Sequence, residues 1–211
     1  SGQVNTGQGE ISDENWSVVS PYKGRRMDYR FFANRMGVNP GTTTDFTSGT
    51  LNFLEISGDT QDFYYAYDDG DNEVTFTTPW TITSGESYVI FVNSDLRINR
   101  NITVDPGGFL FFGVNGSVTV SPSVTTMQGM YVMNDDFTTE SLSPADDTQL
   151  VVEGMVVTWS DVSLGRSLGG VTNGLFPAEQ FVYRTDLLIN MPDKLKSFIF
   201  NWQEVPAGTF D

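Results

Sequence analysis

The sequence predicts an all-β protein that folds as a right-handed parallel β-helix, or β-solenoid. An irregular N-terminal cap and a C-terminal cap containing a short helix complete the predicted fold. Two observations support this class. First, the stretch 88–170 divides into four units of similar length whose apolar residues recur at matching positions. Second, short alternating β segments within each unit are separated by Gly, Asn and Asp. A repeat of roughly twenty residues with these features is typical of a solenoid.

The four predicted coils span 88–108, 109–129, 130–149 and 150–170. When the units are aligned on their turns, three positions are apolar in every unit: Ile90, Phe112, Tyr131 and Leu150 three before the turn; Val92, Val114, Met133 and Val152 just before it; and Leu96, Val118, Phe137 and Val156 three after it. One coil cannot bury its apolar face alone, so stacked coils must supply the core. We therefore expect the first set to form one inward column.

The turns of the first three units place Asn93, Asn115 and Asn134 in register. Asn tolerates the left-handed backbone that a sharp corner needs, and stacked amides can hydrogen-bond to one another. This pattern predicts a structural Asn ladder, with a row of ligand-binding amides as the alternative. An antiparallel sandwich is the competing architecture, but it does not require positions to match across four successive units. Right-handed crossovers are the default for parallel strands.

The flanking segments complete the predicted organisation. Residues 1–20 form an N-terminal arm, residues 21–87 form an N-terminal β cap with irregular coils, and residues 171–211 form a C-terminal cap. Within the last segment we expect a helix from Pro177 to Asn190, ended by Met191 and Pro192. Caps are expected because the open end of a solenoid presents unpaired strand edges.

Composition excludes several classes of function. The net charge is −16, so nucleic acid is not expected as a partner, since phosphate binding needs clustered Lys and Arg. The chain contains no Cys and no His, which excludes disulfides, thiolate catalysis and imidazole chemistry. No apolar run reaches the length that crosses a bilayer, so no membrane span is expected in this chain.

Four carboxylates occur within six residues of the predicted N-terminal cap, at Asp68, Asp69, Asp71 and Glu73. Oxygen ligands around a Gly suit Ca²⁺, while a solvated acidic hairpin tip is the alternative. Calcium is the one cofactor that the sequence suggests. Further acid pairs occur at Asp135-Asp136 and Asp146-Asp147, but no pattern singles out an acid and a nucleophile. No catalytic residue is therefore predicted.

Two N-terminal features suggest a contact between subunits. The arm carries apolar residues that alternate enough to add a strand to a sheet: Val4, Ile11, Trp16, Val18 and Val19. A basic patch follows it: Lys23, Arg25, Arg26, Arg30 and Arg35. The arm either completes the sheet edge of a neighbour by β-augmentation or folds back onto its own solenoid. The patch either lies over the solenoid end or meets an acidic face of another subunit.

Two pieces of the chain are similar to a known group of proteins. One runs Tyr88-Val-Ile-Phe-Val-Asn-Ser-Asp-Leu-Arg-Ile98, and the other runs Phe181-Val-Tyr-Arg-Thr-Asp-Leu-Leu188. Together they resemble uncharacterised secreted or cell-surface proteins of bacteria, notably of the candidate phyla radiation, that carry a right-handed parallel β-helix. The resemblance covers roughly residues 80–206. It implies a surface location and no known activity.

These observations lead to two functional hypotheses. The first is a non-enzymatic extracellular structural protein that self-assembles as a filament, a surface layer or an adhesive module. Its partner would be a second copy of itself or a surface glycan. The alternative is a carbohydrate-binding or polysaccharide-degrading β-helix protein. Its acidic polysaccharide substrates would be repelled by the charge of −16 unless Ca²⁺ bridged them.

Overall fold

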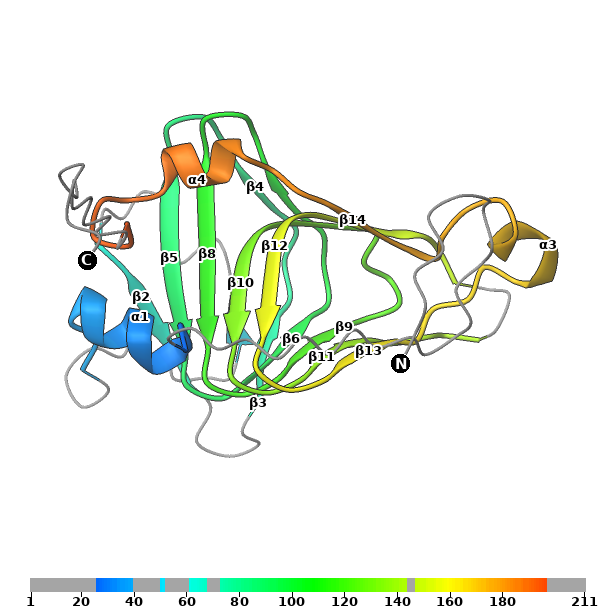
Figure 1. The fold of residues 1–211 in the computed structure, drawn as a ribbon, viewed down its shortest axis with the longest axis horizontal. Helices are drawn as coiled ribbons and strands as arrows, with labels where there is room; N and C mark the ends of the chain where they lie inside the picture. Colours follow the sequence, from blue (N-terminus) through cyan, green and yellow to red (C-terminus); the bar gives the residue numbers. More distant parts are fainter. Residues whose placement is uncertain (1–25, 40–49, 52–60, 68–72, 144–146, 197–211) are drawn as a thin grey trace, which may run out of the picture.

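A computed structural model describes residues 26–39, 50–51, 61–67, 73–143 and 147–196 (Figure 1). In chain order its elements are α1 (Tyr29–Met36), β1 (Thr50–Leu51), β2 (Tyr64–Ala66), β3 (Glu73–Phe76), β4 (Trp80–Ile82), β5 (Ser87–Val92), β6 (Asp95–Ile98), β7 (Ile102–Val104), β8 (Phe109–Val114), β9 (Val118–Val120), β10 (Thr126–Met133), β11 (Phe137–Thr139), β12 (Leu150–Thr158), β13 (Val162–Leu164), α3 (Gly170–Asn173), β14 (Glu179–Val182) and α4 (Asp186–Asn190). Strands therefore dominate the described fold.

The strands form a parallel β-helix, and the fold class predicted from the sequence is confirmed. Every strand pair in the described residues is parallel. A first face contains β2, β5, β8 and the second halves of β10 and β12. A second face follows the order β1-β3-β6-β9-β11-β13. A third face contains β4, β7, the first halves of β10 and β12, and β14. Each coil passes through the three faces in turn.

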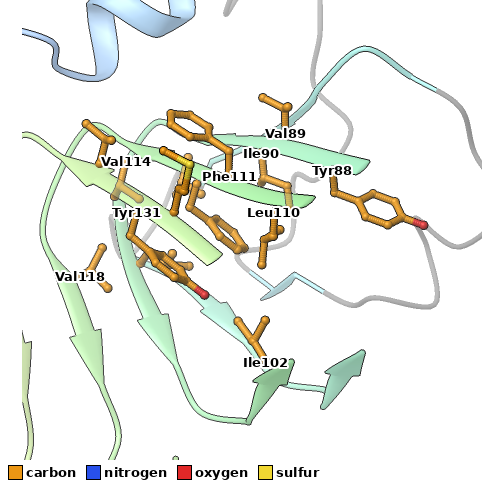
Figure 2. Close-up of a cluster of buried hydrophobic side chains, with 14 of the residues drawn as sticks. Tyr88, Val89, Ile90, Ile102, Leu110, Phe111, Val114, Val118 and Tyr131 are labelled. Carbon is orange, nitrogen blue, oxygen red and sulfur yellow. The ribbon is translucent and has the colours of Figure 1, made fainter. Parts of the chain in front are cut away.

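The central inward column is largely as predicted. Ile90 pairs in register with Phe112, which pairs with Tyr131, and all three are buried. The rings of Phe112 and Tyr131 stack with centroids 5.5 Å apart and an interplanar angle of 5°. Figure 2 shows Tyr131, Val118 and Ile102 approaching one another from the three faces. This interior is the core that stacking was expected to create.

The fourth member of this column was predicted wrongly. Val156, not Leu150, pairs with Tyr131. Leu150 instead begins the first half of β12, on the third face, where it pairs with Glu179. The sequence Val152-Glu153-Gly154 resembles a turn, but it lies within β12, and the chain bends there between two faces. The predicted boundary between the third and fourth units is therefore displaced by six residues.

Helix α1 covers the outer side of the first face (Figure 1). Its N-cap Asp28 accepts a hydrogen bond from the Phe31 amide at 3.0 Å. Tyr29 packs edge-on against Phe91 of β5, with ring centroids 5.9 Å apart. The rings of Phe32 and Phe111 lie 5.0 Å apart. The described part of the basic segment thus contains a helix that lies along the side of the stack and not over one of its ends.

The C-terminal segment contains a shorter helix than the sequence predicted. Residues 179–182, expected to be helical, form strand β14 in register with β12. Only Asp186–Asn190 is helical, as α4. Leu187 is buried, and Asn190 Nδ2 donates to the Gly108 carbonyl at 3.3 Å. The strand edge of β12 offers backbone hydrogen bonds that outweigh local helix propensity. No described helix is long and apolar enough to cross a membrane.

Arg97 ties several coils together from the outer side of the second face. Its guanidinium donates two hydrogen bonds of 2.7 Å to the Glu140 carboxylate. It also contacts Glu73 at 3.2 Å and Ser121 Oγ at 3.3 Å. The hydrogen bond from Arg97 is the main cause that lowers the pKa of Glu140. The charged form of Glu140 therefore stabilises the fold.

Replacing Glu140 with Gln should lower the free energy of unfolding at pH 7 by about 1 kcal/mol, because this ion pair is partly solvated. The pKa of Glu140 is lower in the folded protein than in the unfolded chain. Its charge therefore stabilises the fold above the unfolded pKa, and this stabilisation is lost as the pH falls through the folded pKa. The difference between wild type and E140Q should therefore shrink below the ordinary pKa of 4.5. Urea unfolding at pH 7 and at pH 3 measures it. Asp193→Asn, at a side chain that is 96% exposed, is the control. A difference that persists at pH 3 contradicts the assignment.

Candidate interaction surface at the last coil

Exposed apolar side chains gather on the last coil, which comprises residues 155–182 with the second half of β12, β13, α3 and β14. Among the described residues, the large hydrophobic side chains that are exposed are Leu142, Val162, Val171, Leu175, Phe176, Phe181, Tyr183 and Ile189. All of them except Ile189 lie between positions 142 and 183, in this coil or directly beside it. Val162, Phe181 and Tyr183 share one groove, and exposed apolar side chains that lie together indicate an interaction site.

Two of these residues belong to columns that are buried elsewhere in the stack. Val118 and Phe137 are fully buried, whereas Val162, the next member in register, is 38% exposed. On the third face, Val152 is buried, but its partner Phe181 is 47% exposed. Together with Val156 and other residues they line a groove of about 340 Å³. The interior of the solenoid is therefore open at this end within the described residues.

The backbone of the last coil is also open on the second face. In β6, β9 and β11, a backbone amide near the start of the strand donates a hydrogen bond to a carbonyl of the next coil. These bonds run from Leu96 to the Ser117 carbonyl, from Val118 to the Asp136 carbonyl and from Phe137 to the Asp161 carbonyl, at 2.8–2.9 Å. The same pattern directs the Val162 amide away from the stack. Within the described part of the chain, β13 pairs with β11 alone. An unpaired strand edge of this kind is a template for a further strand.

A column of short polar side chains repeats at the corner before the second face. Each side chain accepts a hydrogen bond from the backbone amide of the next coil. The Ser117 amide donates to Asp95 Oδ1 at 2.8 Å, and the Asp136 amide donates to Ser117 Oγ at 3.3 Å. The Asp161 amide donates to Asp136 Oδ1 at 3.0 Å. Hydrogen bonds from the Ser160 side chain and the Asp161 backbone lower the pKa of Asp136. Asp161 ends the column. Its carboxylate is exposed at the open side, where an added strand would offer it amide donors.

The Asn ladder ends at the same corner. Asn115 Nδ2 donates to Asn93 Oδ1 at 2.9 Å, and Asn134 Nδ2 donates to Asn115 Oδ1 at 2.8 Å. The backbone amide of Tyr29, at the start of α1, donates to Asn134 Oδ1 at 3.0 Å. The position after Asn134 in this row is occupied by Trp159, because Met133 pairs with Thr158. These amides therefore bind one another and α1, as a structural ladder does.

Trp159 connects the last coil to the residues that precede α1. Its indole Nε1 donates to the Met27 carbonyl at 3.2 Å. The Arg26 guanidinium lies 5.3 Å from the centre of a Trp159 ring and forms a 3.0 Å ion pair with Asp28. The chain therefore enters the described fold at Arg26, beside the open coil. Sequence reasoning missed Trp159, because it assigned the turn of the fourth unit to Val152-Glu153-Gly154.

The remaining residues predicted for a subunit contact are not brought together by the described structure. Arg35 donates to the carbonyls of Lys194 and Lys196, both at 2.7 Å, and thereby binds its own C-terminal segment. Arg30 is exposed on α1. Seven of the predicted contact residues lie outside the described residues: Val4, Ile11, Trp16, Val18, Val19, Lys23 and Arg25.

Of the predicted calcium ligands, Asp68, Asp69 and Asp71 lie outside the described residues. Glu73 is in β3 and accepts from Arg97 Nε at 3.2 Å. In the described ranges no group of three or more Asp, Glu, His or Cys residues is arranged to hold a metal ion. Calcium binding at the acidic loop stays a prediction.

A second, polar groove of about 570 Å³ lies on the outside of the third face. Its lining includes Asp105, Gln128, Glu153, Arg184 and Asp186. Arg184 donates to the Val104 carbonyl at 2.6 Å, to Gln128 Oε1 at 3.2 Å and to the Asp186 carboxylate. These contacts attach the segment between β14 and α4 to the stack. Among the residues that the structure describes, no aromatic side chain lines the groove, so these residues offer no stacking platform for a sugar ring.

No protein-family model matches the chain, and neither a curated protein nor a solved structure is detectably similar to it.

Proposed function

We propose that this chain is a non-enzymatic structural protein of the extracellular surface, and that copies associate through the last coil. The observation that carries the proposal is the exposure at this end of apolar residues whose counterparts are buried in earlier coils. Val171 and Phe176, on the loop around α3 in the same coil, are 84% and 58% exposed and add further apolar side chains to this coil. Burying such side chains stabilises a complex by about 1.5–3 kcal/mol each.

The chemistry of the chain agrees with this proposal, and its charge predicts how association should respond to salt. The chain has no His and no Cys, so it lacks the commonest catalytic acid–base and nucleophilic groups. Its net charge of −16 opposes association between copies through long-range repulsion. Salt screens that repulsion, with a Debye length of about 8 Å at physiological ionic strength. Association through an apolar surface should therefore strengthen as salt concentration rises.

The double variant V171D/F176D tests the proposal in the full chain. Wild type should form oligomers in a concentration-dependent manner, and the double variant should associate at least about ten-fold more weakly, because two apolar contacts are replaced by charges. Sedimentation velocity at low and high salt measures both. Ile189→Asp is the matched control, since Ile189 is 73% exposed but lies on α4, away from the last coil. A monomeric wild type, or equal effects of the two substitutions, contradicts the proposal.

The carbohydrate-binding alternative rests on the groove around Arg184. The donors of Arg184 are already engaged by Val104, Gln128 and Asp186. The groove also carries an excess of carboxylates, which disfavours acidic polysaccharides. We therefore favour the structural role.

A further inference from the structure

The two ends of the stack differ in their exposed apolar side chains. Helix α3 projects beyond the last coil at one end of the long axis, whereas α1 and β2 lie toward the other end (Figure 1). The loop around α3 carries Val171, Leu175 and Phe176, which are between 58% and 84% exposed. At the opposite end, Leu51 of β1 and Tyr64 of β2 are at most 2% exposed. Among the described residues, exposed large apolar side chains therefore mark one end of the stack.

Charged side chains show the opposite distribution. Residues 167–178, which include the loop around α3, contain no Asp, Glu, Lys or Arg. Directly before β2, Asp62 forms an ion pair with Lys194, and both side chains are more than half exposed. Asp193, which contacts Lys196, is 96% exposed. Pressing the apolar loop of one copy against this charged end of another copy would take charges out of water without compensation, which is unfavourable.

We propose that two copies of the chain join through their α3 loops about a two-fold axis, and that the assembly closes at the dimer. This inference rests on the proposed function and deepens it, because it names the surface of the second copy that the last coil meets. In a two-fold contact each copy contributes the same surface, so the two apolar loops bury each other. Both loops are then consumed, and the charged ends point outward into solvent.

The charges that flank the loop are engaged within their own chain. Arg166, directly before the loop, is buried and donates to the carbonyls of Ser121 at 2.8 Å and Val124 at 2.6 Å. Glu179, directly after it, accepts a hydrogen bond from Thr139 Oγ1 at 2.6 Å. Repulsion between exposed charges falls off over about 8 Å at physiological ionic strength. An uncharged loop at the tip of each copy therefore lets two acidic chains meet with little like-charge repulsion at the contact.

Hydrogen bonds hold the loop in a defined shape before it meets a partner. The Ser167 amide donates to the buried carboxylate of Asp147 at 2.9 Å. Asn173 Nδ2 donates to Ser167 Oγ at 2.9 Å, and the Leu168 amide donates to Asn173 Oδ1 at 2.7 Å. A loop that is ordered in the monomer loses less conformational entropy on association than a flexible one. The loop is therefore suited to a specific contact.

Single-cysteine crosslinking tests the symmetry in the full chain, which contains no Cys of its own. Thr172→Cys places a thiol on an exposed position of α3, and Asp193→Cys places one at the charged end. A short bismaleimide should link T172C to a second T172C chain at least about ten-fold more efficiently than D193C to a second D193C chain. An equimolar mixture of the two variants should give no excess of T172C–D193C links. Mass spectrometry of the dimer band identifies the linked pairs.

Two further measurements separate this inference from the proposed function. Adding V171D/F176D to T172C should lower its crosslinking about ten-fold, because the apolar contact is replaced by charges. In sedimentation equilibrium the mass of wild type should rise with concentration and level off at twice the monomer mass. Growth beyond the dimer, a preference for T172C–D193C links, or equal linking of the two single variants overturns the two-fold contact while leaving self-association in place. A monomeric wild type overturns both.

Discussion

Replacing Gly154 with Ala should lower the free energy of unfolding by at least about 3 kcal/mol. Gly154 has φ +140°, a conformation that side-chain-bearing residues rarely adopt, and it lies at the bend of β12 between two faces. A Cβ at this position would lie 1.9 Å from the Gly129 carbonyl oxygen. That oxygen belongs to the paired backbone of β10, in register with Gly154, so it cannot move without breaking the ladder. Urea unfolding followed by circular dichroism measures the loss.

Gly170→Ala is the matched control for this substitution. Gly170 begins α3, and a Cβ there would meet nothing within 4 Å. Its stability should change by no more than about 0.5 kcal/mol, since the site is open and helical. If G154A proves as stable as G170A, the bend of β12 is not the constrained junction described above.

Replacing Val114 with Asp should unfold the protein at 25 °C. Val114 is fully buried in the column that pairs Val92 with Val114 and Val114 with Met133. A carboxylate at this position has no partner and is surrounded by apolar side chains, at a cost of several kcal/mol. That cost is comparable with the whole stability of a typical domain, about 5–15 kcal/mol. Loss of the β-sheet circular dichroism signal and of cooperative thermal unfolding would show the expected result.

Two further variants separate the buried charge from other effects. Val114→Ala should remain folded and lose about 2 kcal/mol, since it leaves a small cavity without burying a charge. Ile189→Asp introduces the same carboxylate on an exposed position of α4 and should leave the unfolding midpoint nearly unchanged. A folded V114D with near-normal stability would show that the inward column is not packed as described.

The sequence by itself determined the class of fold and much of its core. Ile90, Phe112 and Tyr131 could be placed in one column because strand residues alternate between inside and outside with a strict period of two. The Asn residues at the corners could be placed in register for the same reason, since they directly follow the last inward residue of each first-face strand. These features depend on local patterning that recurs from coil to coil.

Only the tertiary structure decided where the last coil begins. The spacing from Ile90 to Phe112 is 22 residues, from Phe112 to Tyr131 it is 19, and from Tyr131 to Val156 it is 25. Corner loops can lengthen or shorten at the surface without disturbing the stacked strands, so a fixed period fails where a loop changes. The Gly154 bend could not be distinguished from a turn, because Gly serves both.

The tertiary structure likewise decided the identity of β14 and the candidate interaction surface. Glu179–Val182 pairs with β12 because the stack offers an open edge there, which no local propensity reveals. Val162 and Phe181 are the same kinds of residue as their buried counterparts in earlier coils. Their exposure follows from their place at the end of the stack, where the described residues provide no further coil to cover them. The sequence determines which side chains face inward, and the number and order of the coils determines which of those side chains reach solvent.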